Sequence, residues 1–294
     1  MNPLLGRSPP QHPPITGLSN NYGLKGPLLS MLRLEERFKS QPGSSVWSWQ
    51  AREQDVPWEL SWKTGAEPVW SRYDPMTQEW RCGVARLSEG KRDMGVAELG
   101  GYLYCVGGRD GMVHLSTVEK YDPRGNRWCK MAPMTCHRTG LGVAVLDGYL
   151  YAIGGSDGQS PLYSAERYNP EEDAWSSCPP LGTYRENFGC AVLQGKIYAV
   201  GGHNDFTELC SAEWFDPVTN EWSPMMPMKS KRNKVKAAAA NGYLLATRGG
   251  GVFDGVTRVT PVEAFDLDAN KWRPFGNTKT SHPGGGVAVL KMTI

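Results

Sequence analysis

Short apolar runs alternate with polar turns through most of this chain, and the clearest stretch lies between residues 138 and 175. One run covers residues 138–146 and the next covers 149–153, with only Asp147-Gly148 between them. Two short runs of β-forming residues around an Asp-Gly turn are typical of a β-hairpin. A third run ends at Asn169-Pro170, where the proline sets a turn, and Trp175 lies on a fourth. This stretch therefore predicts four short β-strands.

The same pattern recurs at a nearly fixed spacing. Glycine pairs start 47, 47 and 48 residues apart, at Gly107-Gly108, Gly154-Gly155, Gly201-Gly202 and Gly249-Gly250. Tryptophans fall 48, 47, 47 and 50 residues apart, at Trp80, Trp128, Trp175, Trp222 and Trp272. A period of this size is typical of repeat architectures. Four strands in each copy, without a helical period, predict the blades of a β-propeller.

The repeated residues have physical roles. Each glycine pair ends a second strand, where the missing Cβ allows the backbone to bend and to approach a neighbour closely. Each tryptophan offers a broad apolar face that fills the wedge between adjacent blades. A glutamate occupies one place in every copy, as Glu119, Glu166, Glu213 and Glu263. We expect each of them to pair with a repeated arginine or a backbone donor inside the propeller, rather than to act in catalysis.

The order of an arginine opening the first strand, Gly-Gly, Tyr-Asp-Pro and Trp resembles the kelch motif, and most closely that of the kelch-like proteins. The resemblance covers about residues 69–294 and implies an all-β kelch propeller of four-stranded blades. Complete repeats fall at about residues 91–137, 138–184, 185–231 and 232–281, with partial repeats at 69–90 and 282–294. We assign residues 66–294 to the propeller. The two partial repeats are predicted to close one shared blade, and the Trp-rich segment is a candidate for a degenerate sixth.

Residues 1–65 do not share the repeat and are predicted to form an N-terminal arm. A proline-rich stretch at 8–14 predicts that the arm is partly disordered. Apolar positions within 27–38 favour a short amphipathic helix. Four tryptophans between residues 47 and 62 predict a segment that packs on the propeller, because exposed indoles are poorly solvated.

Composition limits the chemistry. The net charge of +2 does not favour nucleic acid or a membrane as a partner. The seven cysteines include no CxxC pair, and five scattered histidines have no ligand spacing, so we expect no metal and no cofactor. We interpret the cysteines as small buried residues in a reducing compartment. No membrane span, signal peptide, nucleophile elbow or P-loop is found, which predicts a soluble intracellular protein without enzymatic activity or catalytic residues.

In a propeller the linkers that join successive blades and the loops that follow each second strand gather on one face. Loops on a rigid scaffold often carry function, and in kelch-like relatives this face binds a short peptide degron. The candidate partner-binding residues are Asp93, Arg109, Asp110, Thr139, Ser156, Glu186, His203, Phe206 and Asn233. Their charges favour a polar or basic-containing peptide. The run Lys229–Lys236 is interpreted as a solvated loop, with an acidic partner or a nuclear-import signal as alternatives.

By resemblance, the chain is expected to be the substrate-recognition part of a cullin-RING ubiquitin ligase adaptor. Its partner would be a target protein, in the cytoplasm or alternatively the nucleus. No stretch resembles the BTB or BACK domains of full-length kelch-like proteins, so cullin binding is expected only from a form that carries BTB. An actin or cytoskeletal scaffold without a link to ubiquitination is the alternative.

Overall fold

The structure is a computed structural model that describes residues 83–247 and 261–276 with their side chains. It also describes the backbone of strands at 44–46, 49–50, 58–61, 69–74, 79–81, 252–253, 258–260, 277–278 and 288–289. The regular elements in these ranges are all β-strands, as predicted. The predicted disorder of the arm, the predicted helix at 27–38 and the side chain of Trp80 lie outside the described residues.

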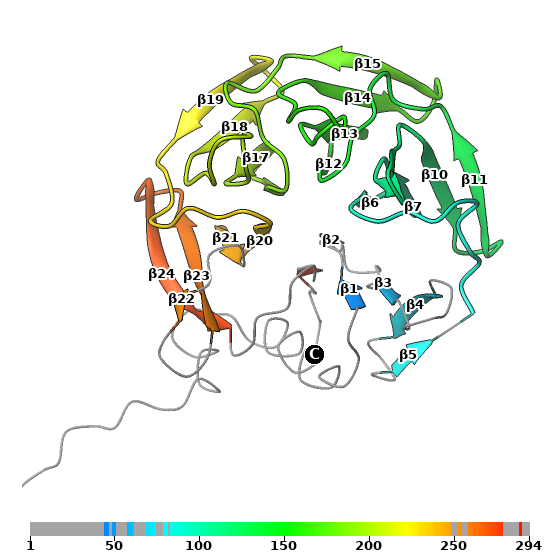
Figure 1. The fold of residues 1–294 in the computed structure, drawn as a ribbon, viewed down its shortest axis with the longest axis horizontal. Coiled ribbons are helices and arrows are strands. Elements are labelled where there is room, and N and C mark those ends of the chain that lie inside the picture. Colours follow the sequence, from blue (N-terminus) through cyan, green and yellow to red (C-terminus); the bar gives the residue numbers. More distant parts are fainter. Residues whose placement is uncertain are drawn as a thin grey trace, which may run out of the picture.

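Antiparallel sheets of four or five strands are arranged around a common centre (Figure 1). Three of them, blades II to IV, have the predicted four strands each. Blade II contains β6 (Gly95–Leu99), β7 (Tyr102–Val106), β10 (Val118–Asp122) and β11 (Arg127–Met131), with a small hairpin of β8 (Arg109–Asp110) and β9 (Val113–His114) between β7 and β10. Blade III contains β12 (Gly142–Leu146), β13 (Tyr149–Ile153), β14 (Ala165–Asn169) and β15 (Ala174–Cys178). Blade IV contains β16 (Gly189–Leu193), β17 (Lys196–Val200), β18 (Ala212–Asp216) and β19 (Glu221–Met225).

Blades V and I flank these three. Blade V contains β20 (Lys236–Ala240), β21 (Tyr243–Thr247), β23 (Arg258–Asp266) and β24 (Lys271–Thr278), and the short β22 (Val252–Phe253) also pairs with β23. Blade I contains β1 (Ser44–Val46), β3 (Trp58–Ser61), β4 (Val69–Asp74) and β5 (Glu79–Arg81). Two strands of blade I therefore come from the stretch that the sequence assigned to the arm.

The C-terminal strand does not pair within blade I. β25 (Ala288–Val289) instead pairs in parallel with β2 (Trp49–Gln50), and β2 also contacts β6 and β20. The closure predicted from the sequence, in which residues 284–290 complete the blade begun by residues 69–80, is therefore not the pairing that the structure has. Strands close in sequence to β4 supply its sheet, and pairing them needs less loop-closure entropy than recruiting the far end of the chain.

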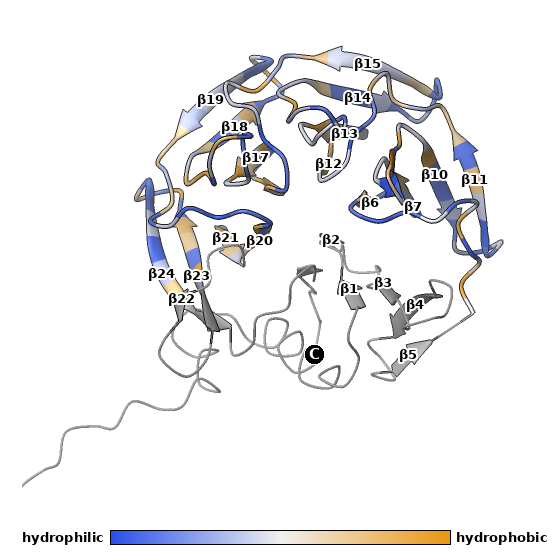
Figure 2. Cartoon of the chain, viewed as in Figure 1, coloured by the Kyte–Doolittle hydropathy of each residue, from blue (hydrophilic) through white to orange (hydrophobic). Residues whose placement is uncertain are grey.

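The core lies between neighbouring blades. The inner strands β6, β12, β16 and β20 contact one another in order around the ring. The second strands of blades II to V are buried along most of their length, whereas the outer strand β11 alternates between exposed and half-buried positions. Figure 2 shows the same contrast, with β7 largely hydrophobic and β11 largely hydrophilic. Such faces are stable only when stacked, because each blade buries its apolar residues against the next.

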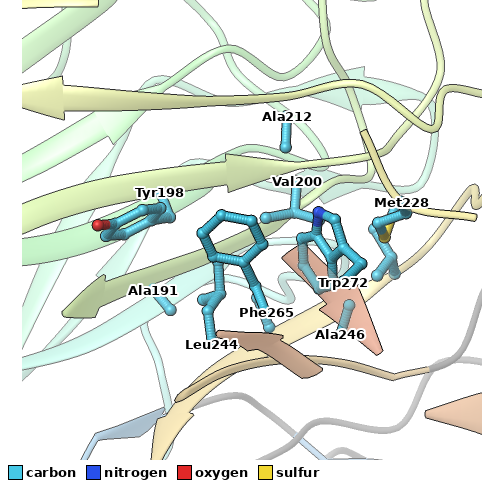
Figure 3. Packing of buried hydrophobic residues seen from close by; sticks show 11 residues of the cluster. Ala191, Tyr198, Val200, Ala212, Met228, Leu244, Ala246, Phe265 and Trp272 are labelled. Atoms are coloured by element: carbon cyan, nitrogen blue, oxygen red, sulfur yellow. The ribbon is translucent and has the colours of Figure 1, made fainter. Parts of the chain in front are cut away.

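The repeated tryptophans fill the wedges between blades, as predicted. Trp272 of blade V packs in a cluster that includes Val200 and Ala212 of blade IV, and Figure 3 shows it close to Phe265 and Met228. The same indole donates a hydrogen bond of 2.8 Å to the carbonyl oxygen of Met226, in the linker from blade IV. Equivalent bonds join Trp128 to Ala85, Trp175 to Ala132 and Trp222 to Pro179. Each tryptophan thus holds the linker that enters its own blade.

This hydrogen bond can be tested at Trp175, whose indole donates to the Ala132 carbonyl oxygen over 2.9 Å. We expect Trp175→Phe to keep much of the aromatic packing against Tyr168 but to lower the free energy of unfolding by about 1–2 kcal/mol, because a partly buried carbonyl loses its donor. Urea unfolding of both proteins measures the difference. Trp214→Phe is the matched control, since no hydrogen bond from the Trp214 indole is seen in the described residues. Equal losses in the two variants would contradict this role.

Each blade from II to V carries a buried ion pair at the entry to its first strand. Arg138 is fully buried and donates to Glu166 Oε1 from both Nε and Nη2, at 3.1 and 2.8 Å. The other oxygen of Glu166 accepts a hydrogen bond from the amide of Thr135, in the linker. The equivalent pairs are Arg185 with Glu213, Arg232 with Glu263 and Lys91 with Glu119. The prediction that these glutamates are structural is confirmed, with a lysine replacing the arginine in blade II.

The glycine pairs join each blade to the next. The amides of Gly108, Gly155 and Gly202 donate to the carbonyl oxygens of Arg138, Arg185 and Arg232, at 2.7–2.8 Å. Because the backbones approach this closely, a Cβ on Gly154 would lie 2.6 Å from the carbonyl oxygen of Arg185. The predicted close approach is confirmed. It ties the end of each second strand to the start of the neighbouring blade.

Candidate functional site: the loop face

Strand direction decides which connections share a face of the propeller. In each antiparallel blade, the linker into the first strand and the loop between the second and third strands lie at the same edge. We name this edge the loop face and define it by linkers 83–94, 132–141, 179–188 and 226–235, together with loops 107–117, 154–164 and 201–211. The turns between first and second strands, and between third and fourth, lie on the opposite face.

Within each blade the linker is bonded to the loop beside it. A backbone bridge joins one residue of each, in the pairs Arg92 with Arg109, Thr139 with Ser156, and Glu186 with His203. Both bonds of every bridge are 2.8–3.0 Å long. These pairs bring six positions of the loop face together, of which the sequence predicted five. The sixth is Arg92, since the bridges align Arg92, rather than Asp93, with Thr139 and Glu186.

A further chain of backbone bonds runs from blade to blade. The amide of Gly140 donates to the carbonyl oxygen of Asp93, and the amide of Asn187 donates to that of Gly140, at 2.9 and 2.8 Å. Asp93 and Asn187 both adopt positive φ angles, of 56° and 52°. The linkers of blades II, III and IV are thereby held in one rigid arc. Side chains that project from this arc are fixed in relative position before any partner arrives.

The blade II part of the loop face is charged. Arg109 Nε donates to Asp93 Oδ2 over 2.8 Å, in an ion pair whose two side chains are 36% and 44% exposed. Arg92 is exposed, and its Nη2 donates to the carbonyl oxygen of Gly111 over 3.1 Å. Asp110 is also exposed. The Asp93 carboxylate is therefore partly neutralised within the protein, while the Arg92 guanidinium meets a neutral oxygen.

Blade III presents a polar and internally bonded surface. The Thr139 hydroxyl donates to the carbonyl oxygen of Gly108 over 3.0 Å and lies 2.9 Å from Nδ1 of His114. Because the hydroxyl hydrogen is used on Gly108, Nδ1 of His114 must carry the proton that completes this contact. Hydrogen bonds from the amides of Ser160 and Gln159 hold the pKa of Asp157 below its usual value. His114 was not among the predicted site residues, and no sequence pattern marks its contact with the next blade.

Blade IV carries the most exposed aromatic residue of this face. Phe206 is 92% exposed, in a loop where Asn204 Oδ1 accepts hydrogen bonds from the Phe206 and Thr207 amides. His203 Nδ1 accepts a bond of 3.2 Å from the Asp205 amide and lies 3.5 Å from Glu186 Oε1. A neutral His203 that accepts from Asp205 has no proton on Nδ1 for the carboxylate.

The linker into blade V is basic. Lys229, Lys231 and Lys234 are exposed, and Lys231 Nζ donates to the Thr207 hydroxyl over 3.1 Å. Asn233 is half-buried, and its Oδ1 accepts no hydrogen bond within the described residues. The predicted basic run is thus on the loop face, against the loop that holds Phe206.

The described residues offer little for catalysis. Within residues 83–247 and 261–276, no cluster of three His, Cys, Asp or Glu side chains could hold a metal ion. Six cysteines there are free thiols, and burial raises the pKa of Cys190 to about 12. Cys129 is exposed, which departs from the prediction of buried cysteines. In the same described ranges no helix is long and apolar enough to cross a membrane.

Comparison with known proteins agrees with this architecture. The family model described as Kelch motif matches residues 91–135, 137–182 and 184–229. Kelch-like protein 4 of Homo sapiens is 44% identical over 69 residues, which cover 24% of this chain and 10% of the relative. Kelch-like protein 9 of Mus musculus is 35% identical over 72 residues, covering 23% and 12%. The aligned part thus spans about a tenth of the length of these curated relatives.

A solved structure shows the same fold. The chain described as "Structure of YjhT" superimposes with a TM-score of 0.66, over 80% of this chain and 84% of that one. The two sequences are 16% identical in this alignment, so the likeness concerns the fold alone.

Proposed function

Because the kelch region of this chain matches the kelch-like family, we propose that the propeller is a protein-recognition module that binds a segment of a target protein on its loop face. The observation that carries the proposal is the rigid arc of linkers. Backbone bonds between Asp93, Gly140 and Asn187 fix three blades in register, and the bridged loops project side chains from them. A preorganised surface of this kind loses little conformational entropy on binding.

We further propose that the module selects targets for a cullin-RING ubiquitin ligase in the cytoplasm. The kelch-like relatives support this, and binding to the cullin itself is assigned to a form of the protein that carries a BTB domain. The chemistry of the described loop face is consistent with selection rather than catalysis. It combines ion pairs, hydroxyls, amides and exposed aromatic rings, which are the groups found at protein interfaces.

The proposal predicts that Glu186→Arg changes target binding. Glu186 is bridged to His203 near the middle of the arc, so reversing its charge changes the surface without touching the core. In affinity purification from cells, we expect target recovery to change at least about tenfold, downward for a basic target segment and upward for an acidic one, which corresponds to about 1.4 kcal/mol. Asn233→Ala should weaken recovery of the same target.

Glu172→Arg is the matched control, because this exposed glutamate lies in a turn on the opposite face. Targets that accumulate on proteasome inhibition would support the adaptor role. Co-sedimentation with actin filaments, without any effect of proteasome inhibition, would favour the scaffold alternative. Unchanged recovery of the target by both Glu186→Arg and Asn233→Ala would contradict binding on the loop face.

A further inference from the structure

Large apolar side chains are exposed mainly on the loop face. The exposed ones in the described residues are Tyr102, Met112, Val113, Tyr163, Tyr184, Phe206, Val218 and Met226. Of these, Tyr102 at the start of β7 and Val218 in the turn between β18 and β19 lie at the opposite face. The most exposed members of the loop face are Met112 at 87% and Phe206 at 92%. Exposed apolar side chains gathered on one face mark an interaction surface.

Met112 and Phe206 occupy equivalent places in two blades. Met112 lies at the turn of the β8–β9 hairpin in blade II, and Phe206 lies in the loop between β17 and β18 in blade IV. The corresponding loop of blade III carries Asp157, Gly158 and Gln159 instead. The Tyr163 and Tyr184 rings, whose centroids are 4.7 Å apart, lie between these two positions in the order of the blades.

A cation from a linker is bonded to each of the two apolar loops. Arg92 Nη2 donates to the Gly111 carbonyl oxygen beside Met112, and Lys231 Nζ donates to the Thr207 hydroxyl beside Phe206, each over 3.1 Å. Both partners are neutral oxygens. Within the described part of the chain, neither cation forms an ion pair with a carboxylate, so its charge is available to a partner.

The linkers as a group are cationic once internal pairs are subtracted. Arg92, Lys229, Lys231 and Lys234 have no carboxylate partner in the described residues. Two of the linker acids have cationic partners, Glu89 with Lys91 and Asp93 with Arg109. Glu186 is the exception, because the His203 Nδ1 atom beside it already accepts a hydrogen bond from the Asp205 amide. The exposed acids Asp110, Asp205 and Glu208 belong to the loops rather than to the linkers. A bound segment that follows the linkers therefore meets positive charge.

We infer that the occupant of this face is an extended, acidic segment of a target protein with two apolar anchor residues, one contacting Met112 and Val113 and the other contacting Phe206. This inference rests on the proposed function and specifies the chemistry of its target. It replaces the polar or basic-containing peptide expected from the sequence, because that expectation counted Asp93 as a free acid and did not include Arg92.

The geometry of the fold sets the spacing of the two anchors. Blades II and IV are separated by two blade-to-blade steps, and packed sheets lie about 10 Å apart, which gives roughly 20 Å. An extended chain advances about 3.3 Å per residue. The two anchors should therefore lie at least about six residues apart, with acidic residues near each of them.

The test is selection of a phage-displayed library of random 16-residue peptides on the full 294-residue chain. We expect enriched peptides to contain two apolar positions at least about six residues apart, together with an excess of Asp and Glu. Synthetic copies of these peptides are then titrated by fluorescence anisotropy. Phe206→Ser and Met112→Ser should each weaken binding at least about tenfold, as expected for interface anchors.

Controls separate this inference from the proposed function. Lys231→Glu reverses a linker charge and should weaken binding as well. Val218→Ser removes an equally exposed apolar residue from the opposite face, and Arg124→Glu reverses an exposed charge there; neither of these two controls should change the affinity. Peptides that bind Phe206→Ser and Met112→Ser as well as the unchanged chain, yet lose affinity for Glu186→Arg, would overturn the inference and leave the proposed function standing. Enrichment of basic peptides would overturn it too. Failure to enrich any peptide sensitive to Glu186→Arg would overturn both.

Discussion

Replacing Arg138 with methionine is expected to lower the free energy of unfolding by about 3–5 kcal/mol, the cost typical of breaking a buried ion pair from one side. Arg138 and Glu166 are 0% and 3% exposed, so the remaining carboxylate would stay buried without its cation. The substitution also removes donors from the carbonyl oxygens of Gly154 and Ser164. These bonds hold the first, second and third strands of blade III together.

Chemical denaturation of the two proteins measures this loss. Arg127→Met is the control, because Arg127 is 72% exposed and lies 3.8 Å from Asp122, where an exposed pair contributes at most about 1 kcal/mol. Adding Glu166→Met to Arg138→Met should recover part of the stability, since no buried charge is then left alone. A loss below about 1 kcal/mol in the single variant would show that the pair is not structural.

The second large effect is expected at Gly202, where Gly202→Ala should lower the free energy of unfolding by about 2–4 kcal/mol. A Cβ at this position would lie 2.6 Å from the Glu186 carbonyl oxygen and 2.7 Å from Phe188 Cβ, and the φ angle is +99°. Overpacking of this kind costs about 1–3 kcal/mol, and an unfavourable φ adds a similar amount. The Gly202 amide also donates to Arg232 across the blade boundary, over 2.7 Å.

Gly148→Ala separates the effect of the steric clash from that of the unfavourable φ angle. Gly148 has a φ angle of +80°, but a Cβ there would meet nothing within 4 Å, so only the unfavourable φ angle would destabilise this variant. We expect this control to lose about 1 kcal/mol. Thermal melting of both variants gives the comparison. Because the displaced oxygen of Glu186 accepts the bond from the His203 amide, Gly202→Ala should also weaken target binding, whereas Gly148→Ala should not.

Features that repeat along the chain could be predicted from the sequence with their partners. Counterparts of Trp175, Glu166 and the glycine pair of blade III occur about 47 residues away in neighbouring repeats. A structural role assigned to a residue of one copy could therefore be assigned to its counterparts in the other copies. The structure confirms the wedge, the ion pair and the close backbone approach in blades II to V wherever the residues are described. Lys91 replaces an arginine in one copy and still reaches Glu119, at 3.4 Å.

Features that belong to one blade alone could not be predicted in this way. The sequence predicted Asp93 for the site in blade II, one place beyond Arg92, because a lysine, Lys91, rather than an arginine opens that copy. The bridge between Arg92 and Arg109 shows which linker residue pairs with the loop, because a shift of one residue in the pairing would turn each side chain to the other face. The contact between His114 and Thr139 joins two blades and has no equivalent among the described residues of the other repeats.

The sequence by itself determined the repeat, the four-stranded blade and the residues that hold one blade against the next. Those features arise from short residue patterns that repeat at a nearly fixed spacing along the chain. Only the tertiary structure decided which charges on the loop face remain available, since the bridge between Arg92 and Arg109 brings Arg109 to the Asp93 carboxylate. It also decided that β25 pairs with β2. Pairing between segments far apart in the chain depends on how the whole ring closes, and no short stretch of sequence specifies that geometry.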